Sequence, residues 1–241
     1  MTESDSAFLK RAAAVRALDF VQEGMKLGLG TGTTADAFLD VLAPRVRGGL
    51  NITGAATSER TAIKARTLGI PVAPLEQLAP LDLTVDGADE TDRALKLIKG
   101  GGGALLREKI VANSSKRMVV VCDGTKLVER LGRFPLPVEV TEFGHAVTAR
   151  GLAECAGDLG YGHAPITLRL SEGAPYKTDG GNVIYDCALG PIRNAATLAV
   201  TLKAITGVVE HGLFIGLATT LVVAHAPENI EIVERKSHAG L

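Results

Sequence analysis

Short β-branched runs alternate with segments of helical periodicity through the first two-thirds of the chain. The apolar runs predict buried strands over residues 25–29, 52–55, 81–85 and 118–122. The periodic segments predict helices over residues 4–21, 35–42, 58–68 and 104–113, the second of them stopped by Pro44. This alternation is typical of βαβ units and favours an α/β fold with a mostly parallel sheet.

The pattern changes after residue 131. Pro135 and Pro137 interrupt the next apolar run, which indicates an edge strand or a crossing between domains. Beyond them the sequence predicts helices over residues 144–156 and 195–205 and strands over residues 166–170 and 182–186. Three short apolar runs follow, and we expect them to complete the main sheet: residues 213–215, 221–223 and 230–233.

The two patterns divide the chain into two expected domains. Residues 1–131 and 210–241 are expected to form the α/β domain, with helices on both faces of its sheet. Residues 132–209 are expected to form a small inserted α+β domain. A length of 241 residues suits one large domain that carries a smaller one.

Composition narrows the class of protein. Apolar residues make up 46% of the chain and charged residues 22%, which is ordinary for a folded globular protein and argues against disorder. The formal net charge of −1 argues against nucleic-acid binding, which requires a clear basic excess. A small anionic ligand needs only a few local donors, so the charge balance does not exclude one.

Targeting and redox signals point to the cytoplasm. The N-terminal sequence is polar and acidic and lacks the plan of a secretion signal, and the absence of an 18-residue apolar run predicts no membrane span. The three cysteines stand alone, as expected in a reducing compartment. The five histidines are scattered, so we expect no metal site.

Glycine is enriched, with 28 residues in 241 against a typical share of roughly 7%, and it clusters at two places. The first cluster is Gly28-Leu-Gly-Thr-Gly-Thr-Thr34, between an expected strand and an expected helix. The N–H groups around Gly32 and the hydroxyls of Thr31, Thr33 and Thr34 suit a phosphate. The last glycine of a dinucleotide fingerprint is missing, and so is the acidic residue that would follow. The alternative is a tight turn with a capping threonine.

An acidic segment, Asp86-Gly87-Ala88-Asp89-Glu90, follows the third expected strand. Three carboxylates within five residues are costly to crowd together unless they hold a cation or handle protons. A magnesium site is possible, but no neighbouring cluster of oxygen ligands supports it. The alternative is a solvated acidic turn.

The second glycine cluster, Gly100 to Gly103, lies between Lys99 and Glu108. A lysine ammonium beside free N–H groups can surround a developing oxyanion, and Glu108 lies on the first turns of the next helix, from which its carboxylate can face the loop. A base and oxyanion donors in one segment suit proton abstraction next to a carbonyl. The alternative is a flexible loop before an exposed charged helix face, although four glycines would be a costly choice for a mere connection.

The fourth expected strand ends at Asp123-Gly-Thr-Lys126, where Lys126 can reach a phosphate. All four turns follow parallel strands, so we expect them to share one edge of the sheet. Together they supply a phosphate cradle, paired aspartates, a lysine and a glutamate. This set suits a cofactor-free enolisation of a phosphorylated sugar better than hydride transfer or hydrolysis, since no activated serine or cysteine is recognisable.

At this level of detail the chain resembles a known family. The segments GLGTGTTA, TSERT, TVDGADE, KGGGGALLREK, DGTK and FPLPVEV, in this order and spacing, are similar to those of the A-type ribose-5-phosphate isomerases, and Thr178-Asp-Gly-Gly-Asn182 extends the match into the insert. The resemblance implies a Rossmann-like sheet with a small ferredoxin-like α+β insert. It also implies assembly as a homodimer or homotetramer, with the insert as the probable oligomerisation element.

The resemblance also implies a reaction, the interconversion of D-ribose 5-phosphate and D-ribulose 5-phosphate through an enediolate without metal or organic cofactor. Glu108 would be the general base. Lys99 and the N–H groups of Gly100, Gly101 and Gly102 would stabilise the oxyanion. The remaining residues implied to bind substrate are Asp86, Gly87, Ala88 and Asp89 of the acidic segment, which would assist ring opening, and Lys10, Thr31, Gly32, Thr33, Thr34 and Lys126 around the phosphate.

Two other classes of function remain open at this point. A related sugar-phosphate isomerase or deaminase, or an acyl-CoA transferase of similar topology, can share the threonine turn, but we do not expect it to carry the lysine–tetraglycine–glutamate segment. A non-enzymatic sugar-phosphate sensor normally carries a DNA-binding helix-turn-helix, and residues 1–24 have room for one helix only.

Overall fold

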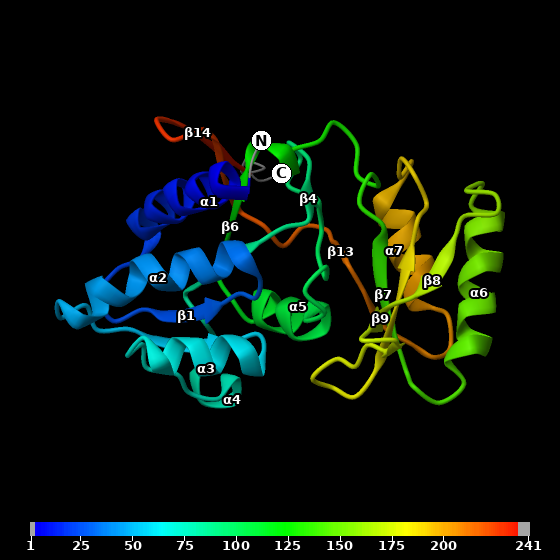
Figure 1. Ribbon diagram of the computed structural model, residues 1–241, viewed down its shortest axis with the longest axis horizontal. Coiled ribbons are helices and arrows are strands. Elements are labelled where there is room, and N and C mark those ends of the chain that lie inside the picture. The colour runs from blue at the N-terminus through cyan, green and yellow to red at the C-terminus, as the bar shows by residue number, and fades with distance from the viewer. Residues whose placement is uncertain (1–2, 236–241) are drawn as a thin grey trace, which may run out of the picture.

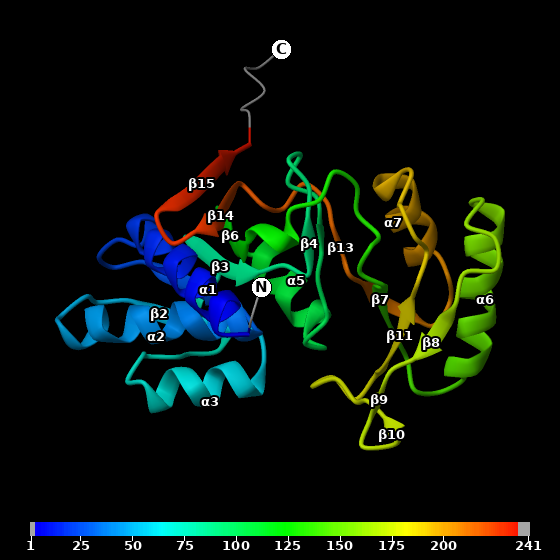
Figure 2. The same ribbon diagram turned by 45° about the horizontal axis from the view of Figure 1, so that its top comes forward.

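The computed structural model describes the backbone of residues 3–235 and the side chains of residues 6–235. The outermost parts of the expected α/β domain, residues 1–2 and 236–241, lie outside the described residues. The chain forms two sheets that lie side by side, each with its own helices (Figures 1 and 2).

The larger sheet has six strands in the order β15-β14-β6-β3-β1-β2. Five of them are parallel, and only the edge strand β15 runs antiparallel, against β14. The predicted strands are confirmed to within three residues at each end, and their bounds are β1 Lys26–Leu29, β2 Thr53–Ala56, β3 Leu83–Gly87, β6 Met118–Asp123, β14 Thr220–Ala226 and β15 Asn229–Glu234. The mostly parallel α/β sheet expected from the sequence is therefore present.

Helices cover both faces of this sheet (Figure 1). The core side chains of α1 and α2 pack against Val119 and Val121 of β6, while Ala112 of α5 packs on the opposite face against Val120. Burial on both faces explains why β6 is a continuous apolar run rather than an alternating one. The helices are α1 Glu3–Ala17, α2 Thr33–Arg47, α3 Glu59–Thr67, α4 Leu75–Leu78 and α5 Leu105–Asn113.

The smaller sheet is antiparallel and has the order β12-β7-β11-β8. Two helices, α6 and α7, pack on it around a separate apolar core (Figure 1). The elements follow the chain as β7 Leu136–Val140, α6 His145–Asp158, β8 Ile166–Leu168, β11 Val183–Cys187, α7 Ala195–Lys203 and β12 Val208–His211. This βαββαβ order is the ferredoxin-like arrangement expected of the insert.

Short elements join the two sheets. A three-stranded sheet, β13-β5-β4, lies between them, and a β9–β10 hairpin projects from the smaller sheet (Figure 2). Two 3₁₀ turns follow α1 and β6. The bounds are η1 Leu18–Phe20, β4 Glu90–Thr91, β5 Leu97–Ile98, η2 Gly124–Lys126, β9 Leu170–Ser171, β10 Ala174–Pro175 and β13 Leu213–Phe214.

Three expectations about single elements are wrong. Pro44 does not stop the second helix, because it lies in the last turn of α2, where it removes one main-chain hydrogen bond while Leu42 and Ala43 stay buried. The run 213–215 does not join the main sheet, because β14 already occupies the position beside β6; Leu213 and Phe214 pair with β5 instead. The strand expected over 166–170 is interrupted at Arg169.

The strand β7 is not an edge strand, although Pro137 lies in it. It pairs with β11 on one side and β12 on the other. The carbonyl of Pro137 accepts a hydrogen bond from Gly212 N–H at 2.8 Å, just beyond the end of β12 at His211. The side of Pro137 that lacks an N–H group therefore lies beyond the end of β12, so no hydrogen bond of the β7–β12 ladder is lost.

Candidate active site

A cleft opens at the carboxyl end of β1 and β3, where the strand order reverses and ligands bind in doubly wound sheets. Its empty volume is about 480 Å³. All of the residues predicted to bind substrate line it except Asp86, which is buried, and Gly101, which is exposed beside Asp89. The lining residues are Lys10, Thr31, Gly32, Thr33, Thr34, Gly87, Ala88, Asp89, Lys99, Gly100, Gly102, Glu108 and Lys126.

Two glycines shape the turn after β1 for different reasons. Gly32 has φ +112°, a conformation that a side chain rarely tolerates, and it is the N-cap of α2. Gly30 lies against β3, where an added Cβ would stand 2.1 Å from Asp86 Oδ1. The turn is therefore a close approach of two strand ends, and it places the first N–H groups of α2 at the cleft.

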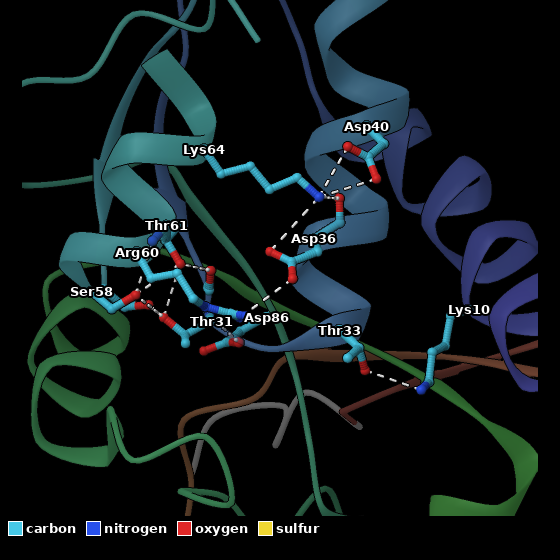
Figure 3. Close-up of polar contacts among 12 residues, drawn as sticks. Lys10, Thr31, Thr33, Asp36, Asp40, Ser58, Arg60, Thr61, Lys64 and Asp86 are labelled. Carbon is cyan, nitrogen blue, oxygen red and sulfur yellow. Dashed lines mark hydrogen bonds and ion pairs between the residues drawn. The ribbon is translucent and has the colours of Figure 1, made fainter. Parts of the chain in front are cut away.

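The hydroxyl of Thr31 is turned away from the cleft into a buried cluster of hydroxyl groups (Figure 3). Its Oγ1 lies 2.7 Å from Thr57 Oγ1, 2.8 Å from Ser58 Oγ and 3.0 Å from Thr61 Oγ1. Thr61 also donates to the carbonyl of Gly30 at 3.1 Å. In this structure the Thr31 oxygen anchors the turn to the start of α3.

The other end of the turn has the features of an anion site. Thr33 and Thr34 begin α2, so their N–H groups have no partner within the helix and carry the positive end of its dipole. Lys10 donates to Thr33 Oγ1 at 3.0 Å (Figure 3), and Lys126 lines the same cleft from the turn after β6. Two ammonium groups and a helix start form a suitable site for a phosphate dianion.

Asp86 is fully enclosed at the end of β3, with 1% of its surface exposed. Its Oδ1 accepts hydrogen bonds from Gly87 N–H at 2.7 Å and Thr31 N–H at 3.2 Å, and its Oδ2 lies 3.0 Å from Lys99 Nζ. Burial raises the pKa of Asp86, while Lys99 and the two N–H donors oppose the shift. Oδ2 has no hydrogen-bond partner among the described residues, and its close neighbour is the Lys99 ammonium, so Asp86 is placed to hold Lys99 rather than to contact a ligand.

Lys99 brings the cationic charge to the centre of the site. Its Nζ donates to the carbonyl of Gly87 at 2.7 Å and lies 3.4 Å from Glu108 Oε1. Burial alone would lower the pKa of Lys99, but Asp86 and Glu108 outweigh it, so the pKa stands above its ordinary value. The side chain is 2% exposed and remains an ammonium between two carboxylates.

Glu108 lies on the first turns of α5, 3% exposed, and lines the cleft. Its Oε2 is buried and has no hydrogen-bond partner among the described residues. Burial raises the pKa of Glu108 to about 8, with Lys99 acting in the opposite direction. A carboxylate that has one free oxygen facing a cleft and a pKa near neutrality is suited to accept and return a proton.

The two buried carboxylates differ in the contacts that favour their charged forms. Two ionised carboxylates and one ammonium would leave a net negative charge in a dry site. Each carboxylate has one buried oxygen without a hydrogen-bond partner among the described residues, but Asp86 also has two main-chain donors and the shorter contact to Lys99. When the group binds a proton, that proton belongs on Glu108.

Asp89 and the tetraglycine loop are in direct contact beside the cleft. Gly101 N–H donates to Asp89 Oδ2 at 2.7 Å, and a Cβ on Gly101 would stand 2.5 Å from Asp89 Oδ1. Gly100 has φ +106° and Gly103 has φ +80°, so the loop also requires glycine for its turns. The loop is an ordered platform and not the flexible connection considered as an alternative.

Glu90 does not belong to the site, although it is part of the acidic segment. Its oxygens accept hydrogen bonds from Gly132 N–H and Phe134 N–H, each at 2.7 Å, in the connection to the smaller sheet. The three carboxylates of the segment therefore point to three different places. Within residues 3–235 no group of three or more metal-ligating side chains is found, and no helix there is long and apolar enough to cross a membrane.

Some side chains that contact the site were not predicted. Arg169 donates to the carbonyls of Gly100 and Gly101, and Tyr176 donates to that of Gly102. Both come from the small domain, Arg169 from between β8 and β9 and Tyr176 from just after β10, more than sixty residues along the chain, and no local motif marks them. The hydroxyls of Thr57, Ser58 and Thr61 were noted only as part of TSERT.

Comparison with known proteins agrees with this geometry. The family model described as ribose 5-phosphate isomerase A (phosphoriboisomerase A) matches residues 53–228. A protein named ribose-5-phosphate isomerase A from Rhodopseudomonas palustris (strain BisB18) is 56% identical over 228 residues, which cover 94% of this chain and 97% of that protein. A protein of the same name from Brucella suis biovar 1 is 53% identical over 216 residues, covering 90% and 93%.

Solved structures give the same result. The ribose 5-phosphate isomerase from Plasmodium falciparum superposes with a TM-score of 0.90 at 33% identity and covers 95% of this chain and 99% of its own. A D-ribose-5-phosphate isomerase solved in complex with phospho-erythronic acid superposes with a TM-score of 0.88 at 34% identity, covering 95% and 99%. The similarity therefore extends over both sheets.

Proposed function

Because the chain belongs to the ribose 5-phosphate isomerase A family, we propose that the cleft between β1, β3 and α5 is where its reaction takes place. The protein is an isomerase that interconverts D-ribose 5-phosphate and D-ribulose 5-phosphate, a step of the non-oxidative pentose phosphate pathway. The observation that carries the assignment of the site is the free, buried Oε2 of Glu108 beside the Lys99 ammonium.

The proposed chemistry moves one proton between neighbouring carbons. Glu108 takes the proton from C2 of the open-chain aldose, and the electron pair forms the C1–C2 double bond of an enediolate with negative charge on O1. The O2 proton passes to O1 as C2 becomes the carbonyl carbon, and Glu108 returns its proton to C1. No electrons leave the substrate, so the proposed reaction needs no redox cofactor, and in this proposal the Lys99 ammonium supplies the positive charge that a metal would otherwise provide.

The other residues have separate roles in this proposal. Lys99 and the N–H groups of the tetraglycine loop stabilise the enediolate oxygen. Asp89, which faces the cleft, contacts a sugar hydroxyl and assists ring opening, while Asp86 acts through Lys99. Lys10, Lys126 and the N–H groups at the start of α2 bind the phosphate.

Domain roles and surroundings are also proposals. The α/β domain, residues 1–131 and 210–241, carries the catalytic groups, and residues 132–209 form the small domain, whose last strand β12 continues to His211. Phe143, Val147 and Val200 are exposed on the small domain, which supports its use as an oligomerisation element in a homodimer or homotetramer. A cytoplasmic location fits the three free cysteines.

The direct test is incubation of the purified protein with ribose 5-phosphate while ketose formation is followed. Ribulose 5-phosphate is expected with wild-type protein, and unphosphorylated ribose should react far more slowly because the two lysines have no phosphate to bind. Treatment with a chelator should leave the rate unchanged. An inactive, folded protein would contradict the proposed site, and activity restored only by added magnesium would contradict the metal-free mechanism.

A further inference from the structure

The tetraglycine loop is held in place from the smaller sheet. Arg169 Nη1 donates to the carbonyl of Gly100 at 2.8 Å and to that of Gly101 at 3.2 Å. Tyr176 Oη donates to the carbonyl of Gly102 at 3.4 Å. The same phenol oxygen of Tyr176 would stand 2.2 Å from a Cβ on Gly103. Three consecutive carbonyls of the loop are therefore bound by side chains of the small domain.

Arg169 is itself fixed by an ion pair with two hydrogen bonds. Its Nε and Nη2 donate to the two oxygens of Asp186 at 2.9 Å and 2.5 Å. Asp186 lies in β11, and Arg169 stands at the break between β8 and β9, where its N–H still bonds to Ile184. A guanidinium held as a fork on a strand is a rigid support, since its planar geometry matches the carboxylate.

The direction of these carbonyls decides where the N–H groups point. Across a trans peptide, the C=O of one residue and the N–H of the next point in opposite directions. Because the carbonyls of Gly100 and Gly101 face Arg169, the N–H groups of Gly101 and Gly102 face away from it. Gly101 N–H reaches Asp89 Oδ2 at 2.7 Å, and Gly102 lines the cleft.

We propose that Arg169 is a positioning residue for the isomerase reaction: by binding the carbonyls of Gly100 and Gly101 it aims the N–H groups of the loop at Asp89 and at the enediolate oxygen. The inference rests on the proposed function of the cleft. The guanidinium charge also polarises both peptides and makes their N–H groups better donors. The small domain thereby completes the active site within a single chain.

The experiment compares Arg169→Ala with wild-type protein and with Arg150→Ala, which removes an exposed arginine from α6 of the same domain. The kcat, the KM for ribose 5-phosphate and the inhibition constant for phospho-erythronic acid are measured. The carboxylate of this acid carries negative charge where the enediolate would. We expect kcat to fall about 10- to 100-fold in Arg169→Ala with little change in KM, and Arg150→Ala to match wild type.

The inhibitor distinguishes positioning from general damage. Donors aimed at the developing charge bind the carboxylate of the acid more strongly than the uncharged carbonyl of the substrate. In Arg169→Ala the inhibition constant for the acid should therefore rise by about the factor by which kcat/KM falls, while KM stays nearly constant. Asp186→Asn removes the ion pair but leaves the Nη1 contacts, and it should lower the melting temperature as much as Arg169→Ala with a smaller loss of kcat. Arg169→Lys should recover part of the activity, and it decides the question if Arg169→Ala does not fold.

Each contrary result has a distinct meaning. Equal kcat values for Arg169→Ala and wild type would contradict the role of Arg169 and leave the proposed function intact. Equal losses of kcat in Asp186→Asn and Arg169→Ala, or an unchanged inhibition constant, would assign Arg169 to stability and also overturn the inference. A wild-type protein that converts no ribose 5-phosphate would contradict the proposed function itself.

Discussion

The ammonium of Lys99 lies 3.4 Å from Oε1 of Glu108, inside a site that is almost completely shielded from water. The contact has two effects on the glutamate. It limits the rise of its pKa that burial causes, and it places the positive charge beside the position where the enediolate forms. The contact thus sets the pKa of the proposed base and stabilises the enediolate that this base forms.

Replacement of Glu108 by glutamine should abolish most of the activity. Glutamine has nearly the same shape but cannot accept the C2 proton, and general base catalysis is commonly worth about 10²- to 10⁴-fold. We expect kcat to fall by at least this factor with a nearly unchanged KM, measured by ketose formation. Near-normal turnover in a folded Glu108→Gln protein would remove Glu108 from the role of base.

The activity should depend on pH through Glu108. Its pKa of about 8 means that the free enzyme loses the basic form as the pH falls below 8. We expect kcat/KM to decline about tenfold per pH unit below that value, measured above pH 6.5 or so, where the substrate phosphate stays a dianion. A profile that is flat between pH 6.5 and 9 would show that Glu108 ionises near its ordinary value.

The free energy of unfolding should depend on the same ionisation of Glu108, but it should fall as the pH rises, whereas the activity should increase. The folded pKa of about 8 stands above the ordinary value of 4.5, so the stabilising contribution of protonated Glu108 is complete below about 4.5 and is lost as the pH rises through 8. The Glu108→Gln protein does not undergo this loss. Its free energy of unfolding should therefore gain on that of wild type between pH 5 and about 9, which urea unfolding at several pH values can test.

The parts of the site that the sequence predicts are those fixed by topology. Thr33 and Lys126 follow the ends of β1 and β6, and parallel strands bring such positions to one edge whatever their distance along the chain. The expectation that the Lys99 loop also follows a parallel strand is wrong, because this loop follows β5, which pairs antiparallel with β4 and β13 outside the main sheet. The helix after Ser58 was predictable for a similar local reason, since the serine side chain caps it. Local patterns of this kind need no knowledge of distant contacts.

The features that the sequence does not predict are side-chain orientations that depend on residues far away along the chain. Glu90 turns away from Asp86 and Asp89 because the N–H groups of Gly132 and Phe134 need an acceptor. The hydroxyl of Thr31 points into a cluster built from residues 57–61, and Pro137 sits in a central strand because β12 ends beside it. None of these partners lies within the segment that the sequence pattern describes.

Replacement of Lys99 by methionine should damage both catalysis and folding. Two buried carboxylates would lose the ammonium that lies between them, and breaking such a buried pair costs about 3–5 kcal/mol. The pKa of Glu108 should rise further, so we expect the pH limb of kcat/KM to move above 8 and kcat to fall about 10²- to 10³-fold. A change confined to KM would assign Lys99 to uniform substrate binding.

Lys126 should act on binding and not on the chemical step. It is half-buried at the end of the cleft that holds Lys10 and the start of α2. A charge-assisted hydrogen bond to phosphate is worth about 1.5–3 kcal/mol, so Lys126→Ala should raise KM about tenfold or more with a small change in kcat. Lys116→Ala is the matched control, because this lysine is 66% exposed and pairs with Asp82. Equal KM values in the two variants would exclude Lys126 from the phosphate site.

The hydroxyl cluster behind Thr31 gives the last prediction. Thr61 is completely buried, and its Oγ1 donates to the carbonyl of Gly30 at 3.1 Å and contacts Ser58 and Thr31. Thr61→Val keeps the shape but leaves these partners unsatisfied, which should lower the free energy of unfolding by about 1–3 kcal/mol.

The same substitution should also reach the active site. The turn that Thr61 anchors provides the Thr31 N–H that holds Asp86, so a looser turn displaces Asp86 and Lys99, and we expect kcat to fall along with stability. Thr67→Val on the same helix is the control, since its exposed hydroxyl bonds only to the carbonyl of Ile63 in its own helix. If Thr61→Val lost stability and kept its full kcat, the cluster would support the fold without holding the catalytic groups in register.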